Sequence, residues 1–345
     1  MPLIIRRDGV KRCAACLAIY YCGRECQVAD RPEYKVPCNL IKKSRQHLQS
    51  EYEKLRDMPA GFLTPDRVFE TCVGRFWCVV ETRPYMRARY HLVDTLLLSH
   101  GTAGGPVDVV QEALDHLLDM LRLCHSDNMG LRQLVPALYM RLGRYQEAYD
   151  FIKWYATTGN ESDYDWGNMD LPFLDVKDAD VLETPPAKLA ERFANPSHVS
   201  ALVLLKVRVL LGLRIIQKTR VALGGTVPAE KIVDLIRAQL VSSGGGSSSI
   251  LPKRSDILLA SPEETTRITD ALQRQIKELY DAAQETNPHF WHLLTENPDA
   301  GALQRPTEAC TMGSRDEALL LVGYSYALWY ETPRAVDMLR GLGKA

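Results

Sequence analysis

The chain has 345 residues, a formal net charge of −1 and a hydrophobic content of 46%. This length leaves room for one large domain or two modest ones, with a sizeable buried core. The near-neutral charge argues against a polyanion-binding surface spread over the molecule, so we expect no nucleic-acid partner.

The first 38 residues hold five of the nine cysteines. They follow the spacing C-x2-C, then C-x3-C, then a single cysteine: Cys13, Cys16, Cys22, Cys26 and Cys38. A stretch this short and polar cannot bury a core of its own, and a C-x2-C knuckle turns both thiolates toward one ion, so zinc is the expected ligand. The alternative, a disulfide framework, needs an oxidising compartment. Residues 1–10 contain no apolar run long enough for a secretory signal, so we expect an intracellular protein, in the cytoplasm or the nucleus.

A longer motif runs through the same cysteines. Its order is Tyr21-Cys22-x3-Cys26-Gln27-x2-Asp30, followed by Lys35 and Cys38. This motif resembles the second half of a MYND-type zinc finger, in which eight ligands hold two interleaved zinc ions. The resemblance implies a finger over residues 1–45, with Cys13 and Cys16 as its second knuckle. It also implies that Cys22 and Cys26 are the helix-borne pair and that Cys38 is the closing ligand.

Three positions depart from the family pattern. The chain has no C-x2-C knuckle before Cys13, Tyr34 stands where the family has its zinc-binding histidine, and Arg31 stands where it usually has a tryptophan. A neutral phenol, with an ordinary pKa near about 10, is a poor zinc ligand at neutral pH. We therefore expect Tyr34 not to replace the imidazole.

The family's interleaved arrangement would group Cys13, Cys16 and Cys38 with the residue at position 34. It would leave Cys22 and Cys26 without partners. Three alternatives stay open: ligands upstream of Met1 complete a second site, four of the five cysteines regroup around one zinc, or the finger has lost its metal. We expect one zinc ion, and two only if ligands upstream of Met1 exist.

From residue 39 onward the apolar residues recur with helical spacing, and we expect an α-helical domain over residues 46–345. The predicted helices cover residues 39–58, 66–81, 85–99 and 107–124. Pro65 and Pro106 precede two of them, where the fixed φ of proline favours a helix start. His47 lies on the first predicted helix and is expected to be a surface residue rather than a metal ligand.

A tight-turn motif lies within residues 135–156. Its order is Leu142-Gly143-Arg144-Tyr145-x2-Ala148. It resembles the turn between the two helices of a tetratricopeptide repeat, where glycine permits the turn and the small alanine lets the helices approach. An unrelated αα-hairpin is the alternative, and a second helical pair over residues 317–330 and 333–342 lacks the glycine turn. We expect a mostly α fold in which a small zinc-finger module precedes a tetratricopeptide-like helical domain.

Two polar segments interrupt the predicted helices. Residues 160–183 carry eight carboxylates and one basic residue, Lys177, and are expected to form an acidic lid or docking loop for a basic partner. Residues 242–249, with the sequence SSGGGSSS, are expected to form a flexible loop. Between them, residues 201–223 are the most apolar stretch, but basic residues interrupt it. It is therefore predicted to be a buried helix rather than a membrane span, and we expect no membrane partner.

No catalytic motif accompanies the cysteines. MYND-type fingers also occur in lysine methyltransferases that carry a SET domain, which makes an enzyme the main competing class. That domain requires β-strands, a glycine-rich cofactor loop and an asparagine-histidine-cysteine motif. The nearest sequence in this chain, Asn195-Pro196-Ser197-His198, lacks the cysteine. The chain also has no G-x-S-x-G and no H-E-x-x-H motif, so we expect no enzymatic activity.

The expected function is that of a non-enzymatic, zinc-binding protein-protein interaction module or adaptor. The resemblance to MYND-type fingers implies a protein partner, such as a proline-containing peptide. Two alternatives remain: a helical scaffold whose finger no longer binds metal, and a relative of the protein lysine methyltransferases.

Overall fold

The structure is a computed structural model of the chain and describes residues 9–61, 64–192, 194–223, 231, 233–235, 238, 250–296, 306 and 310–343. The predicted loop at residues 242–249 lies outside the described residues. The chain forms two compact units: the N-terminal unit comprises residues 2–138 and 165–173, and the C-terminal unit comprises residues 139–164 and 174–345. These two units are defined by contacts within the fold, whereas the predicted division separates a finger at residues 1–45 from a helical domain at residues 46–345. The predicted division stays a prediction.

The N-terminal unit begins with a small antiparallel hairpin of β1 (Lys11–Arg12) and β2 (Tyr20–Tyr21). Helix α1 (Arg24–Arg56) follows directly and runs through Pro32 and Pro37. The helix predicted over residues 39–58 is therefore part of a longer helix that begins at Arg24. Its buried residues recur every three or four positions between residues 34 and 44, which is the pattern of a helix with one face on a core. They are Tyr34, Cys38, Ile41 and Ser44, with Leu55 near the end.

The single helix predicted over residues 66–81 is wrong. The structure has the short helix α2 (Val68–Thr71) and two 3-10 turns, η1 (Phe76–Cys78) and η2 (Val80–Thr82). Gly74 separates them with φ of +81°, a left-handed conformation that ends a helix. A side chain at this position would also meet the sulfur of Met169.

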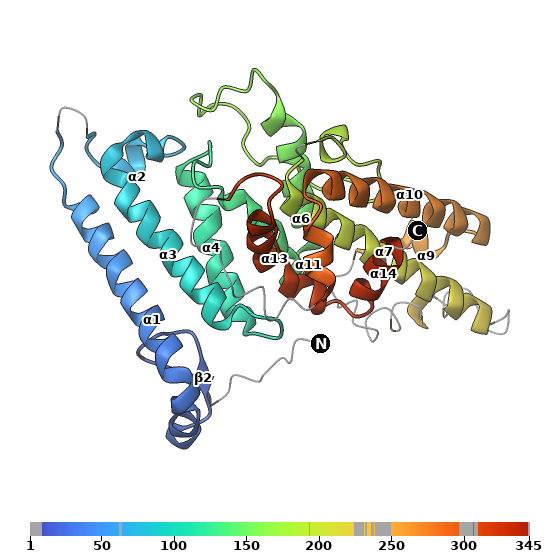
Figure 1. Cartoon of the computed structure of the whole chain (residues 1–345), viewed down its shortest axis with the longest axis horizontal. Helices are drawn as coiled ribbons and strands as arrows, with labels where there is room; N and C mark the ends of the chain where they lie inside the picture. The colour runs from blue at the N-terminus through green and yellow to red at the C-terminus, as the bar shows by residue number, and fades with distance from the viewer. Residues whose placement is uncertain are drawn as a thin grey trace. The chain divides into compact units, whose positions relative to one another are not determined.

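Two longer helices complete the core of the N-terminal unit. They are α3 (Arg83–His100) and α4 (Val107–Leu123), which confirm the predictions at 85–99 and 107–124. Helices α1, α3 and α4 lie side by side (Figure 1), with α3 in contact with both others. A last 3-10 turn, η3 (Leu131–Gln133), follows α4.

Helix α5 (Val135–Arg141) contains the boundary between the units, and α6 (Tyr145–Ala156) follows it after a tight turn. Gly143 has φ of +74° there. The backbone N–H of Gly143 donates to the carbonyl of Met140, and that of Arg144 donates to the carbonyl of Tyr139. This is the Schellman arrangement of a helix end, so the predicted turn is confirmed. The tetratricopeptide-like character of the helical domain stays a prediction.

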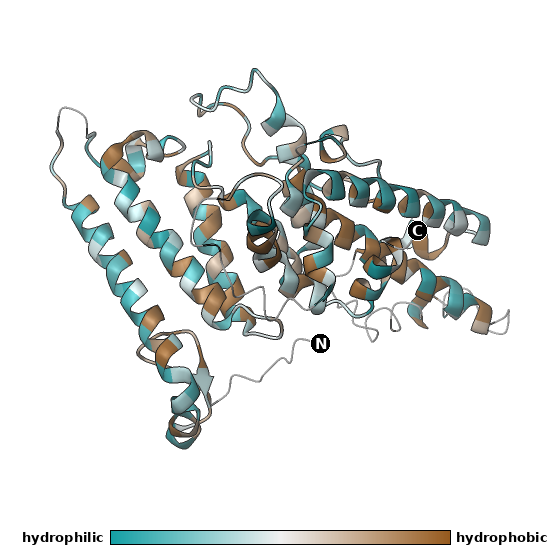
Figure 2. Cartoon of the chain, viewed as in Figure 1, coloured by the Kyte–Doolittle hydropathy of each residue, from teal (hydrophilic) through white to brown (hydrophobic). Residues whose placement is uncertain are grey.

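The C-terminal unit is almost wholly helical. After α6 it contains η4 (Thr158–Asn160), η5 (Ala187–Leu189), α7 (Pro196–Leu223), η7 (Leu251–Lys253), α9 (Ser255–Leu258), α10 (Pro262–Thr286), α11 (Phe290–Glu296), α13 (Arg315–Tyr330) and α14 (Ala335–Leu342). Residues 199–207 of α7 are all buried, which confirms the predicted buried helix in its first part, whereas Lys218 and Val221 near its end are exposed. Figure 2 shows hydrophobic residues along much of α7, whereas the visible side of α10, which packs on it, is mainly hydrophilic. Among the helices of the described residues, none combines the length and the apolarity that crossing a bilayer requires.

Part of the acidic segment is fixed to α6. The carboxylate of Asp150 accepts hydrogen bonds from the backbone N–H groups of Asp178 and Ala179, each at 3.0 Å. The carboxylate of Glu183 accepts one from the ammonium of Lys153 at 2.7 Å. Residues 178–183 are therefore held by hydrogen bonds rather than presented as a loose loop.

Lys206 on α7 also binds residues 178–183. Its side chain is completely buried and donates to the carbonyls of Val181 (2.9 Å) and Glu183 (3.1 Å) and to Oε1 of Gln275 (2.7 Å). Burial lowers the pKa of Lys206 to about 8, so the ammonium keeps its three N–H donors at neutral pH. The three acceptors match these three donors.

The mostly α fold predicted from the sequence, with a small finger at its N-terminal end, is confirmed within the described residues. The finger does not have a core of its own. Its buried cysteines form one hydrophobic cluster with Leu92 and Leu96 of α3 and with Val109 of α4. The helices of the N-terminal unit thus supply the apolar surroundings of the cysteines.

Candidate metal centre

The β1–β2 hairpin shapes the first knuckle of the finger. The backbone N–H of Cys13 donates to the carbonyl of Ile19 at 2.8 Å, and that of Leu17 donates to the carbonyl of Cys13 at 2.9 Å. Leu17 takes a left-handed conformation with φ of +56°, which closes the loop tightly. Cys13 and Cys16 both become buried as a result.

Helix α1 adds two further side chains to this knuckle. Tyr34 and Cys38 lie four residues apart, so they share one face of the helix. The sulfur atoms of Cys13, Cys16 and Cys38 lie within 4.8 Å of one another, and those of Cys13 and Cys38 are 3.8 Å apart. Zinc–sulfur bonds of about 2.3 Å place the sulfurs of a tetrahedral site about 3.8 Å apart. The three thiols therefore fit a zinc ion.

Tyr34 lies where a fourth ligand is needed. Its hydroxyl is hydrogen-bonded to the sulfur of Cys16 and also interacts with the thiols of Cys13 and Cys38. Burial and these hydrogen bonds raise the pKa of Tyr34 well above its ordinary value, so it stays a neutral phenol. A neutral phenol does not fit the position of an anionic or imidazole zinc ligand. The residues present supply three good ligands and one poor one.

The thiols of Cys13 and Cys38 differ in their pKa. Burial alone would raise the pKa of the Cys13 thiol, but backbone hydrogen bonds from Cys16 and Ala15 outweigh it and lower this pKa to about 7. Burial raises the pKa of Cys38 to about 11. Cys13 is thus the thiol most ready to lose its proton, and bound zinc would have to displace the proton of Cys38.

Three neighbouring groups hold the knuckle in place. The side-chain amide of Gln27 donates to the sulfur of Cys13 at 3.5 Å, and the backbone N–H of Ala18 donates to that of Cys16 at 3.4 Å. Nε of Arg45 donates to the carbonyl of Cys16 at 2.7 Å. Such outer contacts orient metal ligands and raise metal affinity.

The other two predicted ligands lie elsewhere. Cys22 and Cys26 are exposed, and they are not part of the buried three-thiol cluster. A hydrogen bond between the thiol of Cys26 and the sulfur of Cys22 raises the pKa of Cys26, so the two side chains are close to each other. Of the five predicted metal residues the structure brings together three, and a regrouping of four cysteines is not what it shows. The role of Cys22 and Cys26 as ligands stays a prediction. No disulfide joins any of the nine cysteines.

One residue beside the cluster was missed by the sequence analysis. His100, the last residue of α3, packs its ring on that of Tyr34 with centroids 5.6 Å apart. Its Nε2 atom is buried and has no hydrogen-bond partner among the described residues. Burial lowers the pKa of His100, which favours the neutral imidazole. No spacing pattern links residue 100 to the cysteines, so no sequence signal could have identified it.

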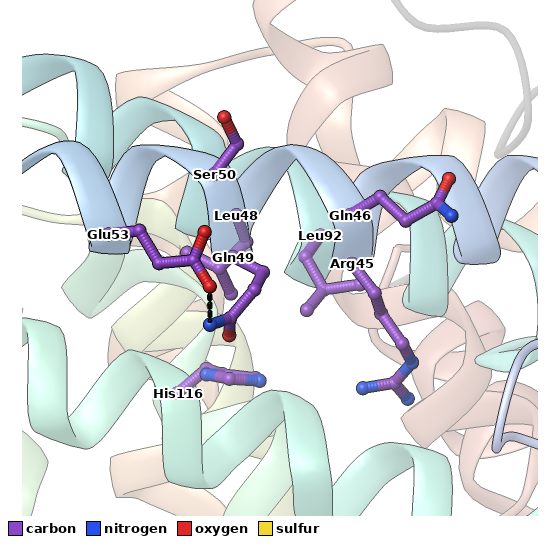
Figure 3. Close-up of a pocket in the computed structure, with 8 residues that line it drawn as sticks. All are labelled: Arg45, Gln46, Leu48, Gln49, Ser50, Glu53, Leu92 and His116. Atoms are coloured by element: carbon purple, nitrogen blue, oxygen red, sulfur yellow. Dashed lines mark hydrogen bonds between the residues drawn. The ribbon is translucent and has the colours of Figure 1, made fainter.

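A shallow pocket of about 500 Å³ lies beside the finger, lined by residues of α1, α3 and α4. Figure 3 shows Gln49 and Glu53 of α1 hydrogen-bonded to each other at one side of it. His116, from α4, accepts a hydrogen bond from Nε of Arg89 at its Nδ1. These polar groups are hydrogen-bonded to neighbours in the protein, so the three-thiol cluster is the stronger candidate site.

Comparison with known families agrees with this geometry. Residues 6–38 match the family model of the MYND finger, and the match ends at Cys38. The chain therefore carries a MYND-type zinc finger, as its cysteine motif predicted. No curated protein and no solved structure matches the chain.

Proposed function

We propose that the chain is a non-enzymatic, zinc-binding protein-protein interaction module. The observation that carries this proposal is the convergence of three buried thiols inside a segment that matches the MYND finger. Their spacing suits one zinc ion, and a metal held there would join the β1–β2 hairpin to α1. We propose an intracellular location, because zinc-binding thiols persist where cysteines stay reduced.

The surface of α1 supports a role in protein binding. Val28, Pro32, Val36 and Leu40 follow one another at intervals of four residues, so they form a stripe along one side of the helix. We call this the α1 apolar stripe. All four are exposed, Val28 at 61% and Val36 at 65%. Contiguous exposed apolar residues are typical of interaction sites, and we propose a proline-containing peptide as the partner.

The acidic segment supplies a second surface. Asp163, Asp165 and Asp170 are exposed, unlike residues 178–183, which are fixed to α6 and α7. We propose that these three carboxylates attract a basic segment of a partner. Their replacement by asparagine should slow association and reduce its dependence on salt, whereas Asp337→Asn on α14, also exposed, should change neither. Binding that is unchanged by the triple replacement would remove this part of the proposal.

One observation favours the alternative of a finger without metal. The hydroxyl of Tyr34 lies against the thiols of the cluster and is hydrogen-bonded to Cys16, so the phenol could hold the sulfurs in place of an ion. Elemental analysis of the purified chain separates the two functions. The proposed module contains about one zinc ion per chain, which Cys13→Ser or Cys38→Ser removes, whereas Cys72→Ser leaves it in place. A metal-free scaffold contains none, and a chelator does not change its melting temperature.

Partner binding is tested with a panel of proline-containing peptides. Val36→Asp places a charge in the middle of the α1 apolar stripe and should abolish peptide binding without loss of zinc. Val221→Asp is the matched control, because Val221 is 82% exposed and lies on α7. Equal binding by both variants would contradict a role for the stripe.

A further inference from the structure

The three-thiol cluster needs one more ligand than the finger offers. Structural zinc sites are almost always tetrahedral with four protein ligands. Cys13, Cys16 and Cys38 fill three positions, and the neutral phenol of Tyr34 fills the fourth poorly. If zinc binds here, a better ligand has to come from outside the finger.

His100 has the chemistry for this role and lies directly behind Tyr34. Among the described residues only the three thiols lie within 4.8 Å of one another, so the ring of His100 has to move toward the sulfurs to bind the same ion. Its ring lies against that of Tyr34, with an angle of 31° between the ring planes. Buried polar atoms normally have a hydrogen-bond partner, and an orphaned one calls for an explanation such as an ion. Nε2 of His100 is such an atom among the described residues.

The other histidines of the N-terminal unit are less suitable. His91 is exposed and its Nδ1 is hydrogen-bonded to the hydroxyl of Ser44 at 3.1 Å. His116 accepts from Arg89, His125 stacks on Phe173, and His47 is exposed on α1. His100 alone combines contact with Tyr34 and an unpartnered buried nitrogen.

We propose that His100 is the fourth zinc ligand, together with Cys13, Cys16 and Cys38, and that Tyr34 turns aside when the ion binds. The imidazole that the family places at position 34 is then supplied by α3 instead. This inference rests on the proposed zinc binding. Its consequence is that one ion joins β1–β2, α1 and α3, so that zinc fixes the finger to the helices of the N-terminal unit.

The test uses the full chain with Cys22→Ser and Cys26→Ser, so that any ion counted belongs to the three-thiol cluster. Zinc affinity is measured by competition with a chromophoric chelator. Cobalt(II), which takes the place of zinc, gives an absorption spectrum that reports the thiolate and imidazole ligands. We expect one ion per chain and a spectrum of three sulfur ligands and one nitrogen ligand.

Three variants assign the nitrogen. His100→Gln should weaken zinc binding by at least about a hundredfold, because loss of an outer partner alone costs about 10–100-fold. It should also remove the nitrogen signature from the cobalt spectrum. Tyr34→Phe should keep both affinity and spectrum. His91→Gln is the matched control, since His91 lies on the same helix, and it should change neither.

Two further variants keep the proposal testable if His100→Gln does not fold. His100→Cys retains a ligand at position 100 and should give a four-sulfur cobalt spectrum, which a residue that only packs on Tyr34 would not produce. Tyr34→His combined with His100→Gln should restore tight binding, because it returns the imidazole to the place that the family uses.

Two results would overturn the inference while zinc binding stands: a cobalt spectrum unaffected by either replacement of His100, or loss of the ion in Tyr34→Phe as complete as in Cys16→Ser. The absence of any bound ion from the unmodified chain would overturn the proposed function as well. The failure of the ligand assignment and that of the function are therefore distinguishable.

Discussion

Arg45 and Glu112 form a two-point ion pair that joins α1 to α4. Both guanidinium Nη atoms contact the carboxylate, with Nη2 at 2.9 Å from Oε2, while Nε of Arg45 donates to the carbonyl of Cys16. The side chains are only about one-fifth exposed, at 22% and 21%. A bidentate pair in partly buried surroundings is stronger than an exposed one. Through the bond from Arg45 to Cys16, this pair also contacts the backbone of the three-thiol cluster.

Arg45→Ala should therefore lower the free energy of unfolding by about 1–3 kcal/mol, as expected for loss of charged hydrogen bonds. It should also weaken zinc binding, because the carbonyl of Cys16 loses its anchor. Denaturant unfolding and zinc competition measure the two effects. Arg56→Ala is the control, since Arg56 pairs with Asp57 at the exposed end of α1 and its loss should leave the stability nearly unchanged. Equal stability of the two variants would contradict the anchoring role.

His116 should make the chain less stable in mild acid. Burial and the nearby guanidinium of Arg89 lower the pKa of His116 from 6.5 to about 4. The unfolded chain then binds a proton between these values that the folded chain does not. Stability contributed by the neutral ring is complete above pH 6.5 and is lost as the pH falls toward 4. At about 1.4 kcal/mol per pKa unit, the loss is roughly 1–3 kcal/mol for this largely buried ring.

Denaturant unfolding at a series of pH values between 4 and 7 measures this dependence. His116→Gln should flatten the profile over that window, because glutamine carries no proton to exchange. His47→Gln, at an exposed position of α1, controls for the removal of a histidine as such. A profile of His116→Gln as steep as that of the unmodified chain would rule out this residue as the source.

Lys206→Met should destabilise the C-terminal unit. The replacement has similar length but leaves the carbonyls of Val181 and Glu183 and the amide oxygen of Gln275 without a donor. Unsatisfied buried acceptors cost about 1–3 kcal/mol, partly offset because the buried ammonium is removed. We expect a net loss of about 1–3 kcal/mol and faster proteolysis near residues 178–183. Lys218→Met, at an exposed position of α7, should change neither the stability nor the rate of proteolysis. A Lys206→Met variant as resistant to proteolysis as the unmodified chain would contradict the role of Lys206 in holding residues 178–183.

Gly143→Ala should cost about 1–2 kcal/mol, because residue 143 has φ of +74° and a Cβ atom is strained in that conformation. Gly341→Ala is the matched control. Gly341 lies within α14, where a Cβ atom would meet nothing within 4 Å. Alanine there should be neutral or should stabilise by about 0.5–1 kcal/mol, since it favours the helix. Thermal unfolding compares the two, and changes of the same sign would contradict the role of the turn.

The longer helices were predictable because each keeps one apolar face over several turns. The predictions at 85–99 and 107–124 agree with α3 and α4 to within two residues at either end. The prediction at 66–81 failed at Gly74, whose left-handed conformation no periodicity reveals. The helix predicted to begin at residue 39 begins at Arg24 and runs through Pro32 and Pro37, and the burial of Tyr34 and Cys38 offsets the hydrogen bonds that the prolines remove.

The sequence by itself determined that the N-terminal segment is a MYND-type finger, since the spacing of the cysteines and the order Tyr21-Cys22-x3-Cys26-Gln27 can be read along the chain. Only the tertiary structure decided which thiols meet. Cys13, Cys16 and Cys38 converge because a hairpin and a helix face each other, while Cys22 and Cys26 point to solvent. It also placed His100 of α3 against Tyr34. The reason is physical: spacing constrains residues within one turn or helix, whereas contacts between distant segments depend on how their apolar faces pack.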